Sequence, residues 1–95
     1  MDCKLVVFSG HAVQRMFERG IGRDGVLAVI ADGETIAEYR DDTPFPSRLL
    51  LGVANSKPLH VVLASDEQAQ RCIVVTVYEP ASEHWSEDFR TRKIK

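Results

Sequence analysis

Apolar and polar residues alternate in short runs over most of this chain, a pattern typical of β-strands. Five runs predict strands, at residues 4–8, 34–39, 48–54, 59–64 and 71–79. Polar or proline-containing segments predict the loops between the last four, at residues 41–47, 54–58 and 65–70. The chain therefore carries enough strands for one sheet.

Between the first two predicted strands, the apolar spacing changes to that of helices. Ser9 is placed to cap a helix over HAVQRMFERG, and Gly20 is placed to end it. A second helix is predicted over residues 23–32, and Gly33 stops it. Such short helices do not persist alone and must pack on the sheet. The order β-α-α-β-β-β-β predicts an α+β fold with two helices on one face of an antiparallel sheet.

Alternation along the last three strands assigns each side chain to one of two faces. One set is aliphatic and is expected to meet the helices: Leu49, Leu51, Val53, Leu59, Val61, Leu63, Ile73, Val75 and Val77. The opposite set mixes aliphatic and polar side chains: Arg48, Leu50, Gly52, His60, Val62, Ala64, Cys72, Val74, Thr76 and Tyr78. If neighbouring strands form hairpins, His60 is expected within reach of Thr76 or Tyr78.

Length and composition indicate one globular domain, because the chain has 95 residues, of which 44% are hydrophobic and 27% charged. Residues 81–95 are expected to form a short tail, with one helical turn or two packed back on the domain. Cys3 and Cys72 are isolated, and the N-terminus lacks the pattern of a secretory signal. We therefore expect reduced thiols and a cytoplasmic location. The apolar runs are too short to cross a membrane.

The formal net charge of −2 argues against a strongly basic nucleic-acid clamp. The charge is unevenly spread, with an acidic segment at residues 32–42 and an excess of basic residues near the C-terminus. The sequence contains no metal-ligand spacing, P-loop, Gly-rich dinucleotide loop or G-x-S-x-G motif. We therefore expect no metal site and no cofactor.

Two clusters are candidates for chemistry. On the mixed face of the sheet, His60 titrates near neutral pH and has Tyr78 and Arg48 as expected neighbours. The alternative is structural: a half-buried histidine with one satisfied hydrogen bond, a tyrosine covering the edge of the core and a solubilising arginine.

The second cluster lies along the first predicted helix. His11, Arg15 and Arg19 recur at i, i+4 and i+8, so they share a stripe that could hold phosphate. The alternative is a solvated face on which an arginine pairs weakly with Glu18.

Four runs resemble, in the same order, a widespread family of small bacterial proteins of unknown function. They are SGHAVQRMFERGI (9–21), DGETIAEYRDDTPFPSRLLLG (32–52), PLHVV (58–62) and VTVYEP (75–80). The fold of that family is similar to the RelE/ParE/BrnT toxin superfamily, and its members are often encoded beside MqsA-like zinc-finger antitoxins. The resemblance implies a toxin-like component of a type II toxin–antitoxin system, with a cognate antitoxin as partner and RNA or the ribosome as a further one.

The resemblance also implies a metal-independent endoribonuclease that cleaves mRNA. In such enzymes the ribose 2′-hydroxyl attacks the adjacent phosphate, a base removes its proton and a cation offsets the developing charge. The residues that fit these roles are His60 as base or acid, Tyr78 as a donor to the phosphate, and Arg48, with Arg15 or Arg90 as alternatives, as the cation. We expect RNA to be bound by His11, Arg15, Arg19, Arg90 and Arg92.

Two other functions stay open. One is a non-catalytic protein-interaction module of the same fold that binds a small partner protein, with Trp85 and Phe89 as anchors. The other is an enzyme that acts on a small molecule and uses His60 as its acid or base. The oligomeric state is not readable from the sequence.

Overall fold

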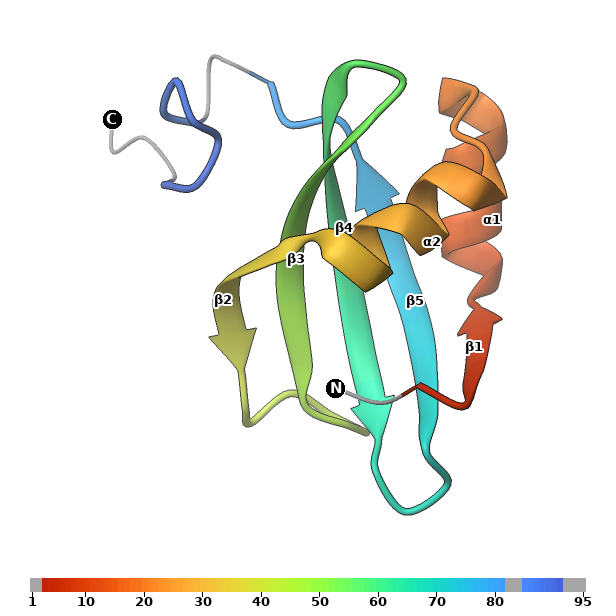
Figure 1. Ribbon diagram of the computed structural model, residues 1–95. Coiled ribbons are helices and arrows are strands. Elements are labelled where there is room, and N and C mark those ends of the chain that lie inside the picture. The colour runs from red at the N-terminus through yellow and green to blue at the C-terminus, as the bar shows by residue number, and fades with distance from the viewer. Residues whose placement is uncertain (1–2, 82–84, 92–95) are drawn as a thin grey trace.

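The computed structural model describes residues 3–81 and 85–91. The elements are β1 (Leu5–Phe8), α1 (Gly10–Arg19), α2 (Arg23–Asp32), β2 (Glu34–Tyr39), β3 (Ser47–Ala54), β4 (Lys57–Asp66) and β5 (Arg71–Tyr78). Figure 1 shows α2 lying across one face of the sheet and α1 lying alongside β5. The α+β class and the order of the elements agree with the sequence-based prediction.

Both ends of α1 form as predicted. The Ser9 hydroxyl accepts a hydrogen bond from the Ala12 N–H at 3.0 Å and caps the first turn. Gly20 ends the helix at a φ of +65°, where its N–H reaches the carbonyls of Met16 and Phe17. Only glycine adopts this left-handed backbone without steric cost. The caps therefore define where the helix begins and ends.

The sheet has the strand order β1-β5-β4-β3-β2, and β2 to β5 form an antiparallel meander. β1 differs from the expectation, because it pairs parallel to β5. The two helices carry the chain across the sheet between β1 and β2, so that β1 lies at one edge and β2 at the other. β1 and β5 can pair in parallel because both helices and the strands β2 to β4 separate them along the chain.

The core lies between the helices and one face of the sheet. It consists of Ala12, Val26, Val29, Leu50, Leu59, Val61, Leu63, Cys72, Val74 and Val77. The prediction for β4 is confirmed, since Leu59, Val61 and Leu63 all face the helices.

The predicted face of β3 was wrong. Leu50 pairs with Val61 and faces the helices, whereas Leu49 and Leu51 pair with Val62 and His60 on the other side. The cause is the two-residue turn at residues 55–56, which has positive φ at both positions and places Ala54 opposite Lys57. A shift of one residue in register moves every side chain to the other face.

A β-bulge in β5 overturns part of its predicted pattern as well. Val62 pairs with Thr76, and the next residue of β4, Leu63, pairs with Val74, so Val75 is the extra residue. Val74 and Cys72 therefore join the core, and Ile73, which was expected there, lies on the opposite face. Beyond the bulge the alternation resumes as predicted, with Val77 in the core.

Cys3 and Cys72 form a disulfide, with their Cα atoms 5.4 Å apart. The expectation of reduced thiols was wrong. Cys72 pairs with Val6 in the sheet, so the bridge ties the start of β1 to β5 across a sequence separation of 69 residues. Closing a loop of this size stabilises the fold by about 4 kcal/mol in the chain-entropy account. Disulfides persist mainly in oxidising compartments, so this bridge does not support the expected cytoplasmic location. That location stays a prediction.

No helix in the described part of the chain has the length and apolar character that crossing a membrane requires.

We predict that Gly52→Ala lowers the free energy of unfolding by roughly 1–3 kcal/mol. A Cβ at Gly52 would lie 2.7 Å from Cγ2 of Val29, which is the contact through which α2 approaches β3. Urea unfolding at neutral pH measures the loss. Gly10→Ala is the matched control, because a Cβ there would meet nothing within 4 Å. Equal losses in the two variants would contradict the prediction.

Candidate functional site

His60 and Tyr78 lie side by side on the sheet face away from the helices. They are register partners in β4 and β5. Nδ1 of His60 lies 3.2 Å from the Tyr78 hydroxyl oxygen, and the two rings meet edge to face with centroids 5.2 Å apart. The alternation of side chains along the strands predicts this proximity, and the structure confirms it.

Residues 85–91, here called the C-terminal segment, cover this pair. The Trp85 ring stands edge-on to His60, with centroids 4.4 Å apart. Nε2 of His60 lies 2.9 Å from the Phe89 carbonyl oxygen. A carbonyl only accepts, so Nε2 carries the proton and donates it, and Nδ1 of the neutral ring accepts from Tyr78. His60 is 0% exposed, and both of its nitrogens are engaged.

This burial determines the protonation state of His60. Desolvation lowers the pKa of the imidazole below its ordinary value, and the hydrogen bond to the Phe89 carbonyl opposes that shift. The ring is therefore neutral at physiological pH. With the C-terminal segment in place it has no route to a substrate, and its contacts are those of a structural histidine.

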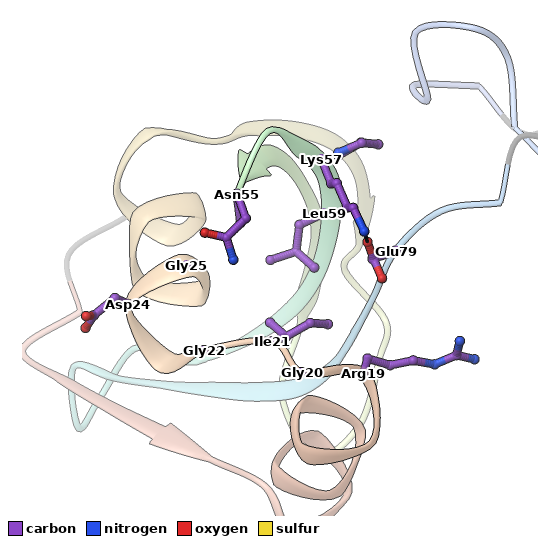
Figure 2. Close-up of a pocket in the computed structure, with 12 residues that line it drawn as sticks. Arg19, Gly20, Ile21, Gly22, Asp24, Gly25, Asn55, Lys57, Leu59 and Glu79 are labelled. Carbon is purple, nitrogen blue, oxygen red and sulfur yellow. Dashed lines mark ion pairs between the residues drawn. The ribbon is translucent and has the colours of Figure 1, made fainter.

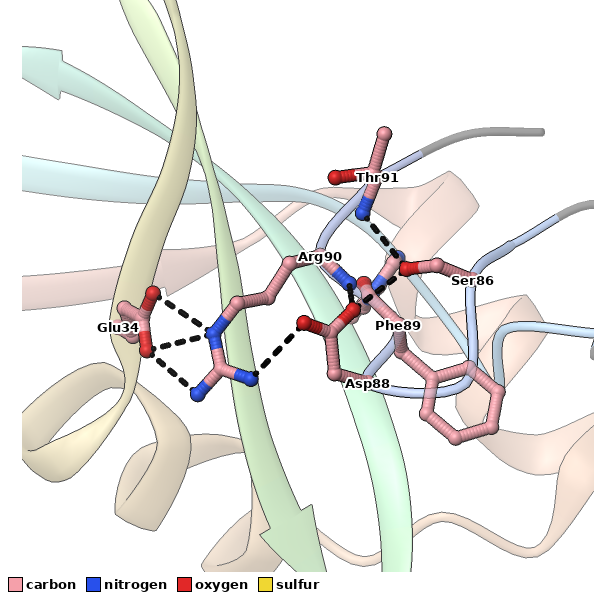
Figure 3. A network of polar contacts seen from close by, with 7 residues as sticks. Glu34, Ser86, Asp88, Phe89, Arg90 and Thr91 are labelled. Atoms are coloured by element: carbon pink, nitrogen blue, oxygen red, sulfur yellow. Dashed lines mark hydrogen bonds and ion pairs between the residues drawn. The ribbon is translucent and has the colours of Figure 1, made fainter. Parts of the chain in front are cut away.

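An ion-pair network fastens the C-terminal segment to β2 (Figure 3). The Arg90 guanidinium donates to both carboxylate oxygens of Glu34, at 2.9–3.1 Å, and lies 3.5 Å from Asp88. The Asp88 carboxylate also accepts from the Ser86 hydroxyl and from the Arg90 N–H. These hydrogen bonds lower the pKa values of Glu34 and Asp88. Arg90, expected to bind RNA, is thus held by acids of its own chain.

The C-terminal segment consists of turns and bends rather than helical turns. Phe89 has a φ of +60°, which a right-handed helix does not allow. The turn is closed by a hydrogen bond from the Phe89 N–H to the Ser86 carbonyl at 2.8 Å. This backbone places the Phe89 carbonyl over His60. Arg92 and residues 82–84 lie outside the described residues.

Arg48 does not join His60 and Tyr78. It pairs with Leu63, a core residue, and so belongs to the helix side of the sheet. The prediction that it shares a face with His60 was wrong, because the turn at residues 55–56 sets the register of β3 one residue away from the expected one. Arg48 instead borders two shallow cavities of about 220 and 300 Å³, which also share Ser65 and Glu67. The predicted catalytic trio is therefore not assembled.

The basic stripe of α1 is exposed. His11, Arg15 and Arg19 are all open to solvent, and Arg15 lies 4.0 Å from Glu18. Figure 2 shows the Arg19 side chain at the end of α1, pointing away from α2. Residues spaced by four lie on one side of a helix, so Arg15 and His11 line the same side. The stripe therefore lies along one exposed side of α1.

Arg19 also borders a cavity of about 230 Å³ between the α1–α2 connection and the β3–β4 hairpin. Lys57 and Glu79 form an ion pair of 3.9 Å at its mouth, as Figure 2 shows, and Asp24 adds a second acid. The charges around this cavity balance, so it does not select for ligands of one sign. Within residues 3–81 and 85–91, no three His, Cys, Asp or Glu side chains gather as a metal site would require.

Sequence reasoning missed two residues of the covered site. Glu34 anchors Arg90 from 56 positions away, and no local pattern links the two. The sequence indicates Trp85 only as an anchor for a partner protein, whereas the structure places its ring on His60. Tryptophan is highly buried on average, so a tryptophan in an otherwise polar stretch is the signal that could have indicated this contact.

One family model matches the chain, over residues 8–79: the domain of unknown function DUF4258. No curated protein matches it, and no solved structure does.

We predict that Arg90→Ala releases the C-terminal segment from the sheet. Trp85 is the single tryptophan of the chain, so its fluorescence reports directly on this segment. Loss of the Glu34 ion pair should shift the emission to longer wavelength and increase acrylamide quenching, because the indole becomes hydrated. Arg40→Ala is the matched control, since it breaks an exposed ion pair with Glu38 elsewhere. An unchanged emission spectrum of Arg90→Ala would show that the Glu34 ion pair does not hold the C-terminal segment on the sheet.

We predict that stability falls as the pH is lowered through the titration of His60. Its folded-state pKa is lowered, so the unfolded chain binds the proton more tightly. Neutral His60 makes its full contribution to the free energy of unfolding above the ordinary pKa of 6.5, and that contribution is lost as the pH falls below this value. Urea unfolding between pH 7.5 and 5 should show a steeper loss in the wild type than in His60→Asn. Parallel profiles would show that His60 is not the group responsible.

Proposed function

We propose that this chain, which belongs to the DUF4258 family, is a toxin-like protein that acts by binding a small partner protein. The order of its elements resembles the RelE/ParE/BrnT toxin superfamily, and that resemblance is the reason for the toxin assignment. A cognate antitoxin is the partner that the resemblance implies.

The burial of His60 is the reason for proposing that the protein binds a partner rather than cleaves RNA. This histidine was the best candidate for acid–base catalysis, yet it is 0% exposed and both ring nitrogens are engaged. Arg48, the proposed cation, lies on the other side of the sheet. A ribonuclease needs base, acid and cation around one phosphate, and these residues do not surround one.

The second candidate is an endoribonuclease whose site opens when the C-terminal segment moves. One observation favours it: His60 and Tyr78 are in contact, at 3.2 Å, beneath the C-terminal segment. In this case the segment would act as a cover, and Arg90 would return to solution when it opens.

Inducible expression in a bacterial host separates the two candidates. Growth and total RNA integrity are followed together for the wild type, Tyr78→Phe and Arg90→Ala. The binding function predicts growth arrest with intact RNA in the wild type and in Tyr78→Phe. The ribonuclease function predicts RNA loss that Arg90→Ala increases, because the cover opens, and that Tyr78→Phe reduces.

Arg40→Ala serves as the expression and folding control, because its ion pair is remote from the site. Normal growth at verified expression of folded wild-type protein would overturn the toxin assignment for both candidates. RNA loss that depends on Tyr78 would overturn the binding proposal alone.

A further inference from the structure

The sheet face that carries His60 holds a segment of its own chain in the way that a binding site holds a ligand. The Trp85 ring packs on His60, and the Phe89 carbonyl accepts a hydrogen bond from the same imidazole. Figure 3 shows Arg90 reaching from the C-terminal segment to Glu34 on β2. These contacts show which groups the face accepts: a large aromatic ring, a carbonyl and a cation.

Hydrogen bonds within the C-terminal segment close it on itself. The Ser86 N–H donates to the Thr91 carbonyl at 2.7 Å, and the Phe89 N–H donates to the Ser86 carbonyl at 2.8 Å. The Thr91 N–H donates to the Ser86 hydroxyl, and the Arg90 N–H donates to the Asp88 carboxylate. These backbone groups keep their partners whether or not the segment lies on the sheet. Leaving the sheet therefore does not orphan them.

The attachment of the C-terminal segment to the sheet is weak. The Arg90 and Glu34 side chains are 47% and 52% exposed, and exposed ion pairs contribute little to stability. Arg90 also keeps a partner off the sheet, since Asp88 lies 3.5 Å away in the same segment. Phe89 has a φ of +60°, which is unfavourable for a residue with a Cβ. Burial of the Trp85 ring opposes release, but a competitor that offers a similar ring replaces that contact.

Two cavities beside the C-terminal segment show that it fills the face only in part. One, of about 390 Å³, has walls that include Leu51 and Val53 of β3. The other, of about 360 Å³, has walls that include Ile36 of β2 and Leu49 of β3. Arg90 borders both cavities. Their volumes lie in the range of ligand sites, roughly 300–1,000 Å³. A segment with larger side chains would gain apolar contacts here that residues 85–91 do not make.

The charge of this face favours a protein segment over RNA. Displacing Arg90 leaves the Glu34 carboxylate without its bidentate partner. A cationic side chain restores that pair, whereas a nucleic acid would bring phosphates to it, and like charges at a contact repel. The occupant is therefore expected to carry an arginine.

We propose that the surface under the C-terminal segment, with the two cavities beside it, docks a partner-protein segment that carries a large aromatic residue and an arginine. This surface is here called the His60 groove. In the free chain the C-terminal segment occupies the groove, and the partner displaces it. The partner's ring replaces Trp85 on His60, and its arginine replaces Arg90 on Glu34. The inference rests on the proposed function, because it names the chemistry of the partner and the place where it binds.

A fluorescently labelled peptide with the sequence of residues 80–95 is the probe, added to the full chain and followed by anisotropy. In the wild type its apparent affinity is reduced by the fraction of chains whose groove is already occupied. Arg90→Ala and Trp85→Ala in the protein loosen its own segment, so each should bind the peptide roughly tenfold more tightly than the wild type does. Arg40→Ala is the matched control and should bind as the wild type does, since it breaks an exposed ion pair elsewhere.

Variants of the peptide identify the groups that the groove recognises. With the Arg90→Ala protein as receptor, Trp85→Ala in the peptide should weaken binding by roughly tenfold. Glu34→Arg in the protein should make it prefer a peptide that carries Arg90→Glu over the unchanged peptide. A loss of structure would not produce such a reversal. Glu34 and Arg90 are exposed, so these substitutions should preserve the fold, which circular dichroism checks.

Several outcomes would overturn the proposal. One is equal affinity of the wild type and the loosened variants for the peptide, or binding by none of them at millimolar concentration. Another is binding of the Trp85→Ala peptide as tightly as the unchanged one, or no reversal with Glu34→Arg. A single-stranded RNA oligonucleotide that displaces the peptide would make the groove an RNA site. Self-association of the wild type in sedimentation that excess peptide dissolves would make the C-terminal segment of a second copy the occupant.

Failure here is distinguishable from failure of the proposed function. A chain that arrests growth, but whose loosened variants ignore the peptide, would remove this inference and leave the toxin-like function standing. A chain whose loosened variants bind the peptide selectively, but which does not arrest growth, would remove the toxin assignment and keep the His60 groove.

Discussion

The register of the β3–β4–β5 meander is the constraint on which the rest of the structure depends. Two local features determine it: the Asn55–Ser56 turn, with positive φ at both residues, and the extra residue Val75 in β5. Together they direct Leu50, Val61 and Val74 toward the helices. They also put His60 and Tyr78 on the opposite face. A slip of one residue would exchange a buried aliphatic face for a mixed one, so core and candidate site are specified by the same pairing.

His60 is a polar side chain buried on the second face of the sheet. A buried imidazole without partners would cost on the order of 1–3 kcal/mol, so its neighbours must supply hydrogen bonds. Tyr78 satisfies one nitrogen, and the Phe89 carbonyl satisfies the other. The second bond requires the C-terminal segment to lie on the sheet. The histidine therefore links the end of the chain to its centre, and the same contact removes it from solvent. The contact between His60 and Phe89 therefore explains why the C-terminal segment lies on the sheet. It also explains why His60 is not accessible as a base.

The sequence predicted the elements well and the faces only in part. Both helices, the Ser9 cap, the Gly20 end and the proximity of His60 to Tyr78 followed from local patterns. Arg48 was assigned to the wrong face because the register depends on how the turn at residues 55–56 closes. The bulge at Val75 and the Glu34–Arg90 ion pair left no local signal, since each depends on a strand or a side chain distant in the sequence. The disulfide between Cys3 and Cys72 was missed for the same reason: the parallel pairing of β1 with β5 brings them together.

The fold places the acidic and basic parts of the sequence at opposite edges of the sheet. The acidic residues 32–42 run along β2 and the loop after it, at one edge, and the basic stripe of α1 lies at the other. Opposite charge on opposite edges would favour head-to-tail association of copies, and such contacts do not close. Two features of the β2 edge oppose this: its register shift, and Arg90, which neutralises Glu34. The β1 edge relies instead on its length, since a strand of four residues offers few backbone groups with which another chain could pair.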